Sequence, residues 1–253
     1  MDLEARALFD PIRRLPQEEA RVYELLRNLP EIDWSKSTNC PRWTIAHLAT
    51  HLVITAQYLS ESIQVALNHP HAKTTSEASL PFQAQDRNGF IKWWAGEIKR
   101  LMTGGANLIL HDLMRTNKDL QKELQKIDLE NASIPFWHPS GEALLSDIPT
   151  FRFYELQLHE WDILAGDNPS QSLNEQAIPL MTDRLPRLLA RYLRLKSRKG
   201  DPKGYIRILL RDPARNFLLK CDLRNSQAEI DDGKSVTTTL TGHSSAFLLL
   251  VSG

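Results

Sequence analysis

The spacing of apolar residues changes along this 253-residue chain, and that change limits the folds open to it. As far as residue 196, apolar side chains mostly recur every three or four residues, which is the period of a helix with one buried face. Turn-rich stretches with proline, glycine, serine and threonine separate these segments. The pattern predicts helices over 18–28, 43–68, 87–103 with a continuation to 127 past Gly104 and Gly105, 145–164 and 175–196.

Beyond residue 196 the pattern changes to one that is typical of strands. The polar, turn-like segment 197–204 comes first, and short alternating or β-branched stretches follow it. These stretches predict strands over 205–210, 217–223 and 236–240, followed by an apolar helix over 244–251. The chain is therefore expected to be α+β, with a four-helix bundle over residues 1–168 and a small α+β domain over 169–253.

Composition excludes several classes of partner. Lys and Arg together number 31, as do Asp and Glu, and this balance argues against a general nucleic-acid binder, which needs a basic excess. The charged N-terminus lacks the apolar core of a secretory signal, and no apolar run approaches the roughly 20 residues that span a bilayer. Cys40 and Cys221 are too few for a disulfide framework. We expect a cytoplasmic protein without nucleic-acid or membrane partners.

One pair of residues on the helix expected over 145–164 can bind a metal. Glu155 and His159 are four residues apart and so lie on one helical face, where their oxygen and nitrogen atoms can meet one ion. His47 and His51 have the same spacing on an earlier helix, and either can supply a third ligand across a bundle. Three protein ligands leave one zinc position open, as in catalytic sites. Spacing alone also allows ordinary surface hydrogen bonds.

Two motifs resemble those of a known family. Residues Thr38 to Leu52 follow the pattern T-x-C-x-x-W-T with a histidine eight residues after the tryptophan, and this histidine is His51. Residues 152–162 follow R-x-x-E-x-x-x-H-x-x-D. In spacing and order, both are similar to the mycothiol-dependent maleylpyruvate isomerase family, whose members are DinB-like metal-binding helical bundles. The resemblance spans most of residues 15–165, and the C-terminal part is weakly similar to the sterol-carrier-like domain that follows such bundles.

The resemblance implies a metal site and a thiol reaction. It implies that His51, Glu155 and His159 bind a divalent metal, with zinc preferred, while catalytic and thiol-binding residues stay unassigned. The implied activity is addition of a metal-bound low-molecular-weight thiol, such as mycothiol, to an electrophilic small molecule. The product would be an isomer, as in maleylpyruvate isomerase, or a thiol S-conjugate. The partners are then the thiol and the electrophile. The protein itself is expected to be a monomer or a homodimer.

Five other residues of the two motifs are expected to have supporting or structural roles. His47 departs from the family pattern, and we interpret it as an exposed helix residue rather than a group that supports the metal ligands. Asp162, one turn after His159, can orient that imidazole or be solvated. Arg152 is expected to pair with a carboxylate, Glu155 or another, in a structural role. We interpret Cys40 as a packing residue and Trp43 as a contact between loop and bundle.

Other residues are consistent with either a site or an ordinary structural role. One of Trp93 and Trp94 is expected in the core, and His138 is expected in a solvated loop rather than in the metal cleft. In the C-terminal domain, a carboxylate clamp or a solvated sheet face explains the arginines equally well, and these are Arg207, Arg211 and Arg224.

Two other functional classes fit the same residues. The three ligands would also serve a hydrolase with a metal-activated water. Alternatively, the C-terminal domain would hold a small apolar ligand in a non-catalytic binding protein. If turnover depends on an added thiol, the thiol reaction is favoured over the hydrolase. If ligand binding needs no metal, the non-catalytic binding protein is favoured.

Overall fold

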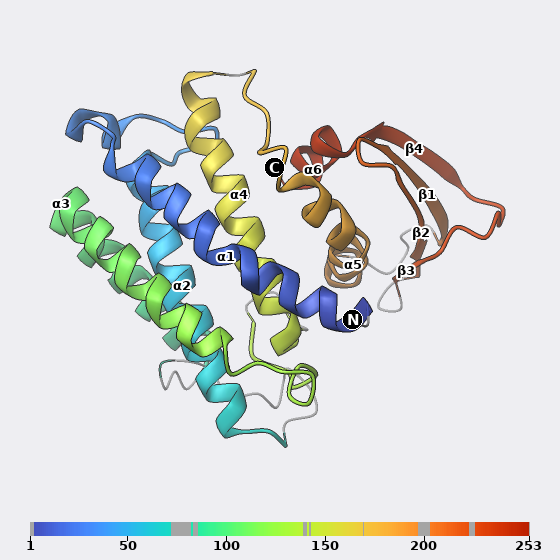
Figure 1. Ribbon diagram of the computed structural model, residues 1–253, viewed down its shortest axis with the longest axis horizontal. Helices are drawn as coiled ribbons and strands as arrows, with labels where there is room; N and C mark the ends of the chain where they lie inside the picture. The colour runs from blue at the N-terminus through green and yellow to red at the C-terminus, as the bar shows by residue number, and fades with distance from the viewer. Residues whose placement is uncertain are drawn as a thin grey trace. The chain divides into compact units, whose positions relative to one another are not determined.

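The computed structural model describes residues 3–71, 82, 86–138, 141, 143–168, 170–196, 203–222 and 226–252 (Figure 1). The chain divides into two compact units, Met1–Gln171 and Ser172–Gly253. The first unit is helical, and the second combines helices with a four-stranded sheet. The predicted α+β class is confirmed.

Four long helices form the first unit. They are α1 (Leu3–Arg27), α2 (Ile45–Asn68), α3 (Arg87–Leu124) and α4 (Ile148–Asp167), with short 3₁₀ turns η1 (Glu31–Ser35) and η3 (Leu145–Asp147). Helix α2 packs against α3 and α4, and α1 packs against the same two helices. The helices are therefore arranged around the bundle in the order α1, α3, α2, α4 (Figure 1).

Helix α1 is longer than the expected 18–28 segment. It begins at Leu3 and contains Pro11 and Pro16, although proline normally ends or bends a helix because it lacks an N–H donor. Leu8, Leu15, Val22 and Leu26 are all buried, so one apolar stripe continues through both prolines. Burial of this stripe against α3 and α4 outweighs the lost hydrogen bonds.

Helix α3 is interrupted by a kink at Gly105. Gly105 has φ 72° and ψ −177°, a conformation outside the helical region that glycine adopts at little cost. The sequence therefore located the break correctly at the pair Gly104 and Gly105. The α4 helix has Pro149 in its first turn, where a missing N–H has no partner to lose.

The second unit has α5 (Ile178–Lys196), then β1 (Gly204–Arg211), β2 (Arg215–Cys221), β3 (Gln227–Glu229), β4 (Thr238–His243) and α6 (Ser244–Ser252). The sheet order is β3-β2-β1-β4, with β1 antiparallel to β2 and parallel to β4. Helix α5 packs on β2 and β3, and α6 packs on β1 and β4. The three-residue strand β3 was not predicted, since it is too short to show an alternating pattern. Part of the expected 217–223 strand lies outside the described residues.

Within the described residues, no helix is long and apolar enough to cross a membrane.

Candidate metal centre

A tight turn leads into α2 and sets the position of His51. The N–H of Trp43 donates to the carbonyl of Cys40 at 3.1 Å, with Pro41 at the second position of the turn and Arg42, φ 69°, at the third. Proline followed by a positive φ is typical of a type II turn. Thr38 closes the loop, since its hydroxyl donates to the carbonyl of Trp43 at 3.0 Å.

His47 caps the helix that carries His51. The Thr44 side chain accepts from the His47 N–H, while the Thr44 N–H donates to His47 Nδ1 at 3.3 Å. This reciprocal pair is a capping box, with histidine in the place that glutamate usually takes. The interpretation of His47 as an exposed helix residue is therefore wrong: it is half-buried because its ring contacts the turn.

Arg152 fixes α4 against the other three helices. Its side chain is fully buried, and its guanidinium lies 3.4 Å from Glu19 Oε1 of α1. It also donates to the carbonyl of Leu52 at 3.0 Å and to Asn117 Oδ1 of α3 at 2.5 Å. The expected carboxylate partner of Arg152 is thus Glu19. Because Arg152 is one turn before Glu155, this network also sets the position of the site.

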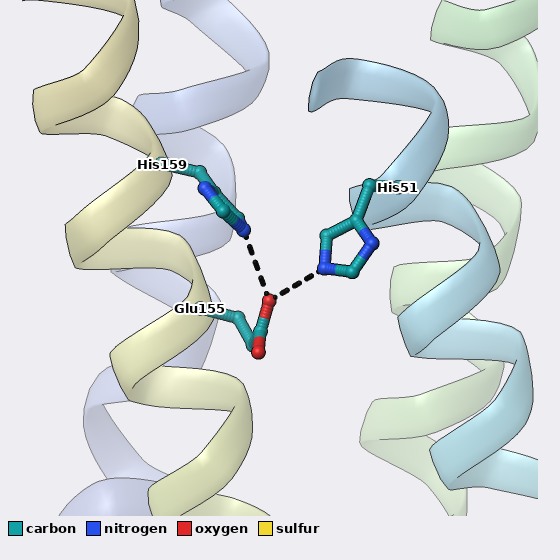
Figure 2. A group of neighbouring side chains, drawn as sticks. All are labelled: His51, Glu155 and His159. Carbon is teal, nitrogen blue, oxygen red and sulfur yellow. Dashed lines mark hydrogen bonds and ion pairs between the residues drawn. The ribbon is translucent and has the colours of Figure 1, made fainter. Parts of the chain in front are cut away.

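The three predicted ligands lie together between α2 and α4. Glu155 Oε2 lies 2.8 Å from His51 Nε2 and 3.2 Å from His159 Nε2 (Figure 2). The two imidazole rings are 5.0 Å apart, centroid to centroid, and nearly perpendicular. One donor atom from each residue lies within 4.8 Å of the other two. His51 and Glu155 are 104 residues apart in sequence, so only the folded bundle brings them together.

Asp162 orients the second imidazole. Its Oδ2 lies 2.9 Å from His159 Nδ1, so the carboxylate holds the proton on Nδ1 and Nε2 faces Glu155. This arrangement of carboxylate behind histidine is common around metal ligands, where it fixes the tautomer. Of the two roles considered for Asp162, the structure shows the orienting contact. Its side chain is 15% exposed, and this excludes the solvated alternative.

The electrostatics of this cluster favour charged forms of Glu155 and His159. Burial acts to raise the pKa of Glu155, but the charges and hydrogen bonds of His51 and His159 hold it well below its usual range. Burial acts to lower the pKa of His159, but Asp162 and Glu155 outweigh burial and raise that pKa to about 9. A metal that bound His159 at neutral pH would therefore displace a proton from Nε2.

The donor set suits a divalent ion such as zinc. Two imidazole nitrogens and one carboxylate oxygen are ligands that zinc accepts, and three such ligands occur in catalytic sites. Glu155 remains 36% exposed, against 19% for His51, so the carboxylate end of the cluster is open to solvent. The residues fit a metal centre with one free coordination position. Metal binding by His51, Glu155 and His159 stays a prediction.

Aromatic residues surround the cluster to an extent that the sequence did not reveal. The Trp43 ring lies 5.2 Å from His51 and 6.3 Å from His159, and the Trp94 ring of α3 lies 5.8 Å from His51. Trp43 is thus a neighbour of both imidazoles as well as a loop contact. Trp93 and Trp94 are both half-buried, so neither is the core residue expected. No sequence motif links Trp94 to the site, because it lies 43 residues from His51 and on another helix.

The remaining candidates lie in other surroundings. Burial and the charge of Asp162 raise the pKa of the Cys40 thiol, consistent with a packing role. His138 lies in a loop as expected, but it is half-buried among aromatic rings, 5.3 Å from Phe151. Arg207 pairs with Asp231 at 2.8 Å and Arg211 is exposed, while Arg224 lies outside the described residues.

A bundle with a two-histidine, one-carboxylate cluster and a following α+β unit defines a class of helical proteins with a candidate metal centre. Sequence comparison is more specific. A family profile described as the mycothiol maleylpyruvate isomerase N-terminal domain matches residues 15–164, and the chain belongs to that family.

Solved structures agree on the fold. The crystal structures of the mycothiol-dependent maleylpyruvate isomerase and of its histidine-to-alanine mutant each match with a TM-score of 0.64 and 12% identity. Each match covers 95% of this chain and 87% of the other chain. At that identity the likeness shows the fold alone. No curated protein gives a significant match.

Proposed function

We propose that this protein is a metal-dependent enzyme that uses a low-molecular-weight thiol, such as mycothiol, against an electrophilic small molecule. The reaction is an isomerisation like that of maleylpyruvate or the transfer of the thiol to the electrophile. The observation that carries the proposal is the convergence of His51, Glu155 and His159, with one donor atom of each within 4.8 Å of the others. Membership of the mycothiol maleylpyruvate isomerase N-terminal domain family supports the thiol.

The chain's own residues prepare this site. His51, Glu155 and His159 would hold the metal, and a divalent ion bound there would lower the pKa of an incoming thiol. Asp162 keeps the His159 proton on Nδ1, so that Nε2 is free to face the ion. The Trp43 ring lies beside both imidazoles and adds an apolar neighbour to the site.

Neither protein thiol is suited to act as the nucleophile. Burial raises the pKa of Cys221, and burial together with the charge of Asp162 raises that of Cys40. Both cysteines are therefore protonated at neutral pH, and a thiol reacts as its thiolate. A nucleophile supplied by a small-molecule thiol agrees with this chemistry.

Metal content measured by elemental analysis tests the site. The protein is purified without a histidine tag or chelator, alongside His51→Ala, Glu155→Gln and His159→Ala. The matched control is His69→Ala, which removes an exposed histidine at the end of the same helix α2. We expect near-stoichiometric zinc in the wild type and the control, and a large loss in the other three. An unchanged metal content in all three, with the helical fold intact by circular dichroism, excludes this metal site.

Thiol dependence tests the reaction class. Turnover of maleylpyruvate and of general electrophiles is measured with and without mycothiol on the metal-loaded protein. We expect turnover only with thiol. Hydrolysis of ester substrates without thiol would instead favour the metal-activated-water hydrolase. A protein that binds no metal after zinc is added back at neutral pH would favour the non-catalytic binding protein.

A further inference from the structure

The rings beside the candidate metal centre form a continuous aromatic surface. From His51, contacts run to Trp94 and then to Tyr58 at 6.4 Å and Phe90 at 5.7 Å. Phe90 contacts Trp137 at 4.8 Å. We use the name aromatic wall for the set formed by Trp43, Tyr58, Phe90, Trp93, Trp94 and Trp137.

The aromatic wall has a buried base and a partly exposed surface. Tyr58 and Phe90 are buried, and the Tyr58 hydroxyl donates to the carbonyl of Trp137 at 2.8 Å. The four tryptophans are all half-buried. Trp93, Trp94 and Trp137 contact Phe90 of the base, and Trp43 joins the set through His51. A single half-buried tryptophan is ordinary. Four in one contiguous set, two of them against a metal-ligand candidate, form a surface suited to a flat apolar group.

Most of the arginine and lysine side chains around the candidate metal centre form ion pairs with carboxylates. Arg152 pairs with Glu19, Arg21 pairs with Glu160 at 2.5 Å, and Lys36 pairs with Asp33 and Asp167. Arg42 and Lys92, which precede Trp43 and Trp93 in sequence, are both exposed, and no carboxylate contact of either is seen in the described part of the chain. A dianionic substrate would be held by such exposed side chains, whereas a neutral planar substrate needs no cation.

We propose that the aromatic wall binds a neutral, planar aromatic or conjugated portion of the electrophile, stacked beside His51. This substrate class rests on the proposed function, since it places the electrophile next to the thiol. Trp94 and Trp43 are the specificity residues, because their rings lie beside the imidazole of His51 and come from two different elements. Small aliphatic dianions such as maleylpyruvate are then poorer substrates than neutral aromatic electrophiles.

Binding of an unreactive probe tests the wall apart from catalysis. The probe is 1,3-dinitrobenzene, a flat neutral ring, and its binding to the full-length protein is measured by equilibrium dialysis. Trp94→Leu keeps an apolar side chain without the flat ring, so we expect its affinity to fall about two- to tenfold, the range expected for one aromatic contact. Trp94→Phe restores most of the affinity. Tyr192→Leu, which removes an exposed ring of the second unit, leaves it unchanged.

The outcomes separate this proposal from the metal-thiol function. Affinity that is unchanged in Trp94→Leu and in Trp43→Leu, with both variants folded, overturns the wall. The proposal is also overturned if the dianion maleate binds more tightly than dinitrobenzene and its binding is lost in Arg42→Gln. Dinitrobenzene binding that depends on Trp94 in a protein without zinc supports the wall while the proposed function fails. A protein that binds zinc but not dinitrobenzene supports the metal site and overturns the aromatic wall.

Discussion

Replacing Arg152 by methionine tests what holds the bundle together. The guanidinium is fully buried, and its carboxylate partner Glu19 is only 2% exposed. The methionine side chain is neutral and shorter, and it leaves Glu19 in the core without its cation. Burial already raises the pKa of Glu19 in the native protein, even though the charge of Arg152 acts to lower it. The cost of burying this carboxylate is therefore large before the arginine is removed.

The magnitude follows from that unpaired charge. Removing one partner of a buried ion pair costs about 3–5 kcal/mol, and we expect Arg152→Met to lower the free energy of unfolding by this amount. Replacing both Arg152 and Glu19 by methionine should recover at least about 2 kcal/mol, since paired apolar replacements are often neutral. An exposed control, Arg27→Met, breaks a surface pair with Glu24 and should cost less than about 1 kcal/mol.

Urea unfolding followed by tryptophan fluorescence measures these values. All six tryptophans lie between Trp34 and Trp161, so the signal reports the helical unit without a contribution from the second unit. Protonation of Glu19 relieves the unpaired charge, and a raised pKa gives stability that is present at low pH and lost as pH rises. The deficit of Arg152→Met should therefore increase from pH 5 to pH 8. A deficit below about 1 kcal/mol at pH 8 would refute the reasoning, because a buried unpaired carboxylate costs more.

Three further predictions concern the same unit. Arg100 and Arg115 outweigh burial and lower the pKa of Asp112, so the charged carboxylate stabilises the fold above its unfolded pKa, and this stabilisation is lost as pH falls through the folded pKa. Asp112→Asn should therefore lower the free energy of unfolding by about 1–3 kcal/mol at pH 7 in urea unfolding, and should not change it at the acid limit. Arg42→Gly should raise stability by up to about 1 kcal/mol, since glycine avoids the cost of φ 69°; a lower thermal midpoint contradicts this. Gly166→Ala places a Cβ 2.8 Å from the Ser37 carbonyl and should lower the midpoint, whereas Gly96→Ala, with open space on α3, should raise it; equal effects would count against the clash.

Periodicity predicted most of the bundle because its helices bury one regular face. The start of α1 was missed because Pro16 resembles a helix start, while the apolar stripe through Leu8 and Leu15 continues beyond it. Strand β3 was missed for a different reason: three residues carry too little pattern, and pairing with β2 defines it. In both cases packing against another element decides the outcome, and local sequence does not contain that information.

The candidate site shows the same division. Spacing left His47 and His51 equivalent as ligands, and the structure distinguishes them because Thr44 binds the ring of His47. The resemblance to the family had already selected His51, and the geometry places it beside Glu155. The contact of Trp94 with His51 had no local signal, since it depends on how α3 lies against α2.

The long separation between the two halves of the site has a consequence for folding. Glu155 and His159 come from one helical turn, but His51 enters from a helix 104 residues away. The chain must lose the entropy of closing this long loop before His51 can join the other two residues. Glu155 and His159 alone would bind an ion only weakly. An ion that needs all three residues can therefore be captured only late, when α2 and α4 have docked. Its uptake would report completion of the bundle.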